Sequence, residues 1–273
     1  MSDAVIPVVS ALVVAGLCAL APQLIARLPE PEPEPESERA EDSGDAERQD
    51  DGDAGERATE RAKESDRVLS PMAGVETPPK VPYAELAARP QLALKLAIWG
   101  AVVGLLLGLG IGDEPILLAW IYLGVVGVVL GYIDAQTRLL PTRIIAPSYG
   151  VLIVLIGLAA AFDGDTDDLV RAGLGWLAYG GFYFLMWVVY PRGLGYGDVR
   201  LSGLLGLALG YLGWGEVLVG MYAGFLLGGI IGGVLALAKV VDRKRYPFGP
   251  FMLVGAVVGV LAGGPFADWY VGR

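Results

Sequence analysis

The feature that most constrains this chain is its series of long apolar stretches, because a helix needs about 20 such residues to cross a bilayer. The sixth stretch covers only 14 residues, so we expect it to begin earlier, to tilt little or to lie where the bilayer is thinned. With 54% hydrophobic residues and a mean hydropathy of +0.55, the chain is too apolar for an ordinary soluble domain. The predicted fold class is an all-α polytopic membrane protein with eight transmembrane helices, at residues 5–26, 92–111, 115–133, 144–162, 169–190, 199–212, 217–240 and 251–270.

Basic residues predict the orientation of these helices, since cytoplasmic connections carry an excess of Lys and Arg. Eighteen of the twenty basic residues lie in alternate connections, starting after the first span, and only Arg171 and Arg273 fall on the other side. We therefore expect the N-terminus and the C-terminus outside. The short sixth span is supported too, because Arg200 and Lys239 share a side only if the chain crosses twice between them. A re-entrant hairpin is the alternative.

Charge and hydropathy together divide the chain into three expected parts. Residues 30–66 hold sixteen acidic and five basic side chains, net −11, whereas the rest of the chain carries +1. Such a sequence cannot bury a core and predicts disorder. We expect an N-terminal transmembrane anchor at 1–26, an acidic, largely disordered cytoplasmic loop at 27–91 and a seven-helix membrane domain at 92–273. The loop is interpreted as a solvated spacer, with attraction of basic partners as the alternative.

Several glycines recur four residues apart, a spacing that lets helices approach closely in lipid. We expect these glycines to mark helix–helix contacts; they are Gly100, Gly104 and Gly108, then Gly224, Gly228 and Gly232, then Gly255 and Gly259.

Two aspartates lie away from both the acidic segment and the outer connections. Asp134 ends the third span within GYIDAQTRLLPTRI, and Asp198 opens the sixth within GYGDVRL. Singly, Asp198 could be a helix N-cap and Asp134 a partner of Arg138, four residues on. Both, however, lie at the predicted cytoplasmic edge of the bilayer, each beside glycine and tyrosine. The chain has no histidine, and two carboxyl groups across a cleft are the minimum for acid–base hydrolysis without histidine or metal.

Three motifs, which follow one another along the chain, resemble the signatures of one family. Residues 195–198, Gly-Tyr-Gly-Asp, match the GxGD signature of intramembrane aspartyl proteases. Asp134 followed by Leu140-Pro141 resembles the first-aspartate motif of the prepilin peptidases, or type IV leader peptidases. Residues 246–251, Tyr-Pro-Phe-Gly-Pro-Phe, resemble the PFGP signature of that family. Presenilin-type proteases share GxGD but carry Pro-Ala-Leu as their third signature, so the resemblance over residues 92–270 is to the prepilin peptidases.

The resemblance implies cleavage of a short basic leader from prepilin or pilin-like precursors at the cytoplasmic face of the cell membrane. It implies Asp134 and Asp198 as the catalytic residues of the 92–273 domain, with no metal and no other cofactor. Besides these precursors we expect the lipid bilayer as a partner and no nucleic acid; the oligomeric state is not predicted. The residues expected to support or shape the substrate site are Gly195, Tyr196, Gly197, Pro141, Pro247, Phe248, Gly249 and Pro250.

The helix positions of the two aspartates suggest their roles at rest. Asp198 lies at a helix N-terminus, where the dipole favours the anion, and Asp134 lies at a helix C-terminus, where the dipole disfavours it. We therefore expect Asp198 to be the resting base and Asp134 the resting acid, although such a pair titrates as a unit.

The first loop departs from the family pattern. Bifunctional members of the family carry paired cysteines for zinc there and also N-methylate the trimmed pilin. Residues 27–91 contain no cysteine, and the single cysteine of the chain is Cys18. We therefore expect N-methylation to be weak or missing.

Three other functions stay open at this point. They are a GxGD aspartyl protease with a non-pilin membrane substrate, a carboxylate-based transporter, and a non-catalytic scaffold whose acidic segment is a docking arm. A transporter is disfavoured because no convincing internal repeat is seen and both aspartates lie at one face.

Overall fold

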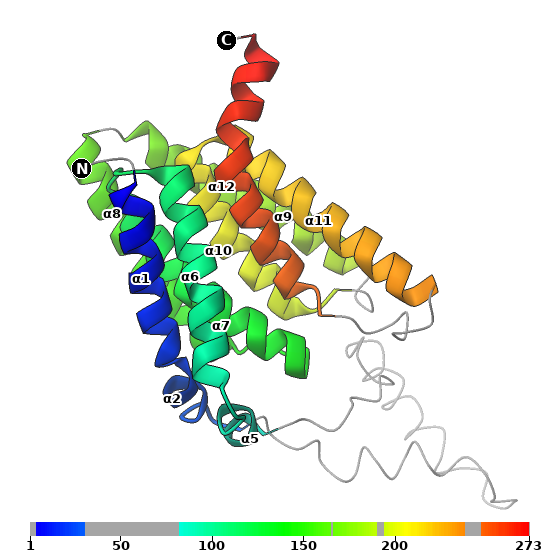
Figure 1. The fold of residues 1–273 in the computed structure, drawn as a ribbon. Coiled ribbons are helices and arrows are strands. Elements are labelled where there is room, and N and C mark those ends of the chain that lie inside the picture. Colours follow the sequence, from blue (N-terminus) through cyan, green and yellow to red (C-terminus); the bar gives the residue numbers. More distant parts are fainter. Residues whose placement is uncertain (1–3, 31–81, 165, 190–193, 238–246, 273) are drawn as a thin grey trace, which may run out of the picture. The chain divides into compact units, whose positions relative to one another are not determined.

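The computed structural model describes residues 4–30, 82–164, 166–189, 194–237 and 247–272, with side-chain surroundings omitted for 231–237. Within these ranges all regular elements are helices, so the all-α prediction is confirmed (Figure 1). They belong to one unit, Met1–Leu28 with Tyr83–Arg273, and a second unit, Pro29–Pro82, lies almost wholly outside the described residues. The helices are α1 (Val5–Ala19), α2 (Ala21–Ile25), α5 (Tyr83–Ala87), α6 (Leu92–Ile111), α7 (Leu117–Thr137), α8 (Thr142–Asp163), α9 (Asp167–Val189), α10 (Tyr196–Leu212), α11 (Trp214–Leu237) and α12 (Gly249–Val271).

The described residues contain six segments long and apolar enough to cross a membrane, which makes the chain an integral membrane protein by length and composition. These are α1 with α2, then α6, α7, α8, α9 and α12, and α11 adds a shorter apolar stretch at Trp214–Ile230. The sixth predicted span corresponds to α10, which begins at Tyr196 and has 17 residues, so it does start earlier than its apolar run. The count of eight crossings and the outside termini stay predictions.

Glycines allow the closest helix pairs to pack backbone against backbone. A Cβ added at Gly108 of α6 would lie 2.6 Å from Pro7 Cα of α1, and one at Gly259 of α12 would lie 2.9 Å from Gly220 Cα of α11. Atoms in ordinary contact stay farther apart, so only glycine fits there. The predicted packing role is confirmed for the glycines of α6 and α12 and for Gly224 and Gly228, whereas Gly232 lies outside the residues whose surroundings are described.

Part of the predicted 27–91 loop forms a helix that the sequence analysis did not anticipate. In α5, Tyr83 and Leu86 are buried against the rest of the unit, and α5 packs on α2. The hydroxyl of Tyr132 in α7 donates to the Leu86 carbonyl at 3.4 Å, so this tyrosine ties α7 to α5. The acidic residues 31–81 lie outside the described part of the chain.

Candidate active site

Asp134 lies in the last turn of α7 and is buried, with 4% of its surface exposed. The helix ends at Thr137, and the next residue, Arg138, adopts a left-handed conformation (φ 57°) and its N–H donates to the Asp134 carbonyl at 2.7 Å. The carboxylate oxygen Oδ2 accepts a hydrogen bond of 3.0 Å from the main-chain N–H of Gly249, at the start of α12. Asp134 therefore lies at the end of α7, and its carboxylate contacts the start of α12.

Asp198 lies in the first turn of α10 and is also buried, with 7% of its surface exposed. It is not the N-cap, as one sequence alternative had it: Gly195 is the N-cap in an extended conformation, and Asp198 is the third helical residue. The Gly195 N–H donates to Asp198 Oδ2, and the Asp198 N–H donates to the Gly195 carbonyl, both at 3.0 Å. Oδ1 of Asp198 is buried and has no hydrogen-bond partner among the described residues.

The structure brings the segments that carry the two aspartates together. Leu140, in the turn between α7 and α8, joins their surroundings. A Cβ added at Gly197 would lie 2.8 Å from Leu140 Cβ, and one at Gly249 would lie 3.5 Å from Leu140 Cδ1. The three sequence motifs, from α7, α10 and α12, therefore meet around one leucine.

The comparisons with known proteins bear on this meeting point. Residues 120–237 match the type IV leader peptidase family, a segment that contains both aspartates. The residues that start α12, including Gly249, lie beyond the matched segment.

Several proteins similar to this chain carry the same printed name, prepilin leader peptidase/N-methyltransferase. The protein from Aeromonas hydrophila is 29% identical over 194 residues, which cover 69% of this chain and 63% of the relative. The protein from Stutzerimonas stutzeri is 30% identical over 146 residues, covering 52% of this chain and 48% of the relative. The chain thus spans less than two thirds of the length of these relatives. No solved structure matches the chain significantly.

The remaining predicted site residues lie in the first turns of helices or just before them. Tyr196 is 43% exposed, and its ring lies 4.5 Å from the Arg200 guanidinium and 5.2 Å from the Trp187 ring. Pro141 is the N-cap of α8, and Pro250 lies in the first turn of α12, as expected of a residue that starts a helix. Pro247 is half-buried just before α12, and Tyr246 lies outside the described residues.

Sequence reasoning missed a polar network beside Asp198. Arg200, two residues on, donates a short hydrogen bond to the Thr142 hydroxyl of α8, and the Tyr149 hydroxyl of α8 donates to the Arg200 carbonyl at 2.7 Å. The spacing of Tyr196 and Arg200, one turn apart on a helix, was the available signal for their stacking. This network fixes the start of α10 against α8.

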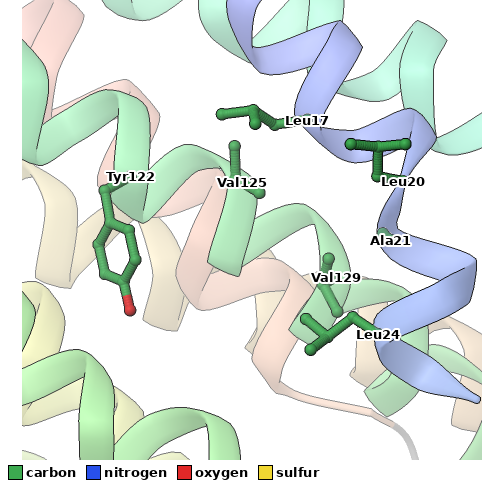
Figure 2. A pocket seen from close by; sticks show the side chains of 7 residues that line it. All are labelled: Leu17, Leu20, Ala21, Leu24, Tyr122, Val125 and Val129. Carbon is green, nitrogen blue, oxygen red and sulfur yellow. The ribbon is translucent and has the colours of Figure 1, made fainter. Parts of the chain in front are cut away.

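An apolar hollow of about 320 Å³ lies elsewhere, between α1–α2 and α7 (Figure 2). Val125 and Val129 line it, and at 3.6 residues per turn they point roughly 180° and 140° away from Asp134 around α7. This hollow is therefore not part of the carboxylate site. In the described part of the chain no group of three or more His, Cys, Asp or Glu residues is placed to hold a metal ion, and the expected absence of a metal stays a prediction.

Proposed function

We propose that this protein is a prepilin leader peptidase that uses Asp134 and Asp198 as a catalytic pair. The observation that carries the proposal is the meeting of two buried carboxylates from separate motifs, of which Asp198 keeps one oxygen without a partner among the described residues. Polar groups buried in apolar surroundings are normally satisfied, so an unpaired carboxylate oxygen favours a chemical role. The peptidase relatives support the substrate class.

The proposed chemistry needs only these two groups and water. One carboxylate takes a proton from the water while the oxygen of the water attacks the scissile carbonyl carbon. The other carboxyl group, which is protonated, gives its proton to the carbonyl oxygen. The resulting tetrahedral intermediate breaks its carbon–nitrogen bond as the carboxyl that took the water proton passes it to the leaving amine. A hydroxyl of the intermediate gives its proton to the other carboxylate as the new carboxyl group of the leader forms. The products are the free leader carboxylate and the amino terminus of the mature pilin, with both carboxyl groups returned to their starting states.

The resting roles of the pair are less distinct than the helix ends suggested. Asp134 does end α7, but its Oδ2 also receives an N–H at the start of α12, as Asp198 receives one at the start of α10. Each anion is therefore favoured by one helix N-terminus. We propose that the two carboxyls share one proton, with Asp198 as base and Asp134 as acid still the working assignment.

The position of Lys and Arg along the chain supports a site at the cytoplasmic face of the cell membrane, with both termini outside. It also fits the short basic leader as substrate. We further propose that N-methylation is weak or missing, because the chain has a single cysteine, Cys18, outside residues 27–91.

A membrane assay tests the proposal. Membranes containing the full chain are incubated with a candidate prepilin precursor and a methyl donor, and the mass of the product is measured by mass spectrometry. We expect loss of the leader without an added methyl group. An intact precursor, across several pilin-like precursors, would contradict the peptidase proposal, and a trimmed product carrying a methyl group would contradict the methylation proposal alone.

A further inference from the structure

We propose that the main-chain N–H of Gly249 is a positioning group for Asp134, so that the start of α12 belongs to the working site. This inference rests on the proposed role of the aspartate pair. The hydrogen bond from Gly249 N to Asp134 Oδ2 is 3.0 Å long and buried, and it joins residues 115 positions apart. It engages one carboxylate oxygen and thereby limits rotation of the group about its last torsion.

The donor is available because of its place in the helix. Gly249 is the first residue of α12, and the first N–H groups of a helix have no partner within it. The helix hydrogen bonds begin later, with the N–H groups of Phe251 and Met252 donating to the Phe248 carbonyl. The Gly249 N–H is thus free to serve Asp134, and the positive end of the helix dipole points the same way.

Space, not backbone conformation, requires glycine at this position. Gly249 does not have a positive φ, so other residues could adopt its backbone angles. A Cβ added there, however, would lie 2.8 Å from Asp134 Oδ2 and 3.3 Å from its Cγ. An alanine would push directly on the carboxylate that the N–H holds, and its nearest other neighbour, Leu140 Cδ1, lies at an ordinary 3.5 Å.

The residue before the donor holds the start of α12 in place. Phe248 is 9% exposed, its ring lies 5.8 Å from that of Tyr183 in α9, and a Cβ added at Gly228 of α11 would overlap it. Two other helices therefore fix Phe248, and with it the direction of the next N–H. The PFGP motif contributes an aromatic anchor followed at once by the donor.

The test uses Gly249→Ala in the full chain, with Gly229→Ala as the matched control, because a Cβ at Gly229 meets nothing within 4 Å. We expect Gly249→Ala to lower kcat for leader cleavage by about 10- to 100-fold through displacement of a catalytic group, with KM changed less than about threefold. The control should keep both constants. An unchanged kcat in Gly249→Ala, or a loss expressed only in KM, would overturn the inference.

A second readout does not depend on peptidase activity. The melting temperature is compared for Gly249→Ala in the wild-type background and in an Asp134→Ala background, where the carboxylate is gone. We expect alanine at 249 to lower the melting temperature clearly in the first background and much less in the second. Equal effects in both would show that Gly249 does not act through Asp134. If the wild-type chain cleaves no precursor, the proposed function fails, while this coupling still decides whether the contact exists.

Discussion

The two ends of α10 differ in how completely their polar groups are hydrogen-bonded. At the C-terminal end, Arg171 of α9 donates to three successive carbonyls and pairs with Asp168 at 2.7 Å, while the Tyr211 hydroxyl donates to Asp163 at 3.0 Å. The three carbonyls are those of Gly210, Tyr211 and Leu212. At the N-terminal end, Asp198 keeps a buried oxygen without a partner in the part of the chain that the structure describes.

This difference separates stabilising polar groups from those poised for chemistry. The last carbonyls of a helix have no partner within it, so Arg171 supplies what the end of α10 lacks. That role also explains why a basic residue stands on the predicted outer side, against the trend of the chain. At the other end, an unsatisfied buried carboxylate costs stability, and proteins accept such a cost mainly at functional sites.

The largest expected effect comes from converting one of the two site aspartates, Asp134 or Asp198, to its amide. Asp134→Asn and Asp198→Asn should each lower the rate of leader cleavage by about a thousandfold or more, since an amide can neither accept nor return the proton. The rates are measured in membranes at equal protein levels.

The opposite end of the bundle provides the matched control. Asp163→Asn makes the same chemical change at the residue that accepts from Tyr211, and the amide oxygen can still accept that bond. Its cleavage rate should stay within about threefold of wild type. Processing retained in either dyad variant, or lost equally in Asp163→Asn, would remove the distinction between the two ends.

The next largest effect concerns the packing of α9 against α10. A Cβ added at Gly175 of α9 would lie 2.6 Å from the Gly206 carbonyl oxygen and 2.7 Å from Gly210 Cα. Gly175→Ala should therefore destabilise the fold by about 3 kcal/mol, because backbone cannot move aside as a side chain can. Gly181→Ala in the same helix meets nothing within 4 Å and is the control. Equal melting temperatures for the two variants would contradict the close α9–α10 contact.

A smaller effect is expected from Arg171, which should act on stability alone. Arg171→Met removes the donors to the end of α10 and should cost about 2 kcal/mol. The cleavage rate of the folded fraction should change little, since the aspartates lie at the other end of the helix. Melting temperature and cleavage rate are measured on the same preparation. A large fall in rate without a fall in melting temperature would mean that the two ends are not separate.

The smallest effect is expected from Glu114, in the connection between α6 and α7. Partial burial raises the pKa of Glu114, and the negative charges of Asp163, Asp113, Asp168 and Glu216 raise it further. A raised carboxyl pKa means that ionisation disfavours the fold above the pKa of the unfolded chain, and that this cost is absent at lower pH. Glu114→Gln should thus raise the melting temperature slightly at pH 7 and not at about pH 4. An equal shift at both pH values would speak against a charge effect.

Sequence was sufficient for the features that depend on local composition. Apolar length predicted the long helices, four-residue glycine spacing predicted their close contacts, and the three motifs pointed to one site. The partners that meet in contacts between distant segments were not predictable, because nothing local in the sequence specifies them. The bond from Gly249 to Asp134 spans 115 residues, and Leu140 touches two helices that begin far along the chain. The short helix α5 was missed because the neighbouring acidic segment dominated the composition.

The central claim is that residues 134 and 198, from separate motifs, form one site, and cross-linking tests it most directly. Asp134→Cys and Asp198→Cys are combined with Cys18→Ser, and the membranes are treated with a short bifunctional thiol reagent. The control pair is Asp134→Cys with Asp163→Cys, since α8 has 22 residues and separates its ends by roughly 33 Å. We predict an intramolecular cross-link for the 134/198 pair and none for the control. Failure of the 134/198 pair to cross-link, with both cysteines shown to react singly, would contradict the account.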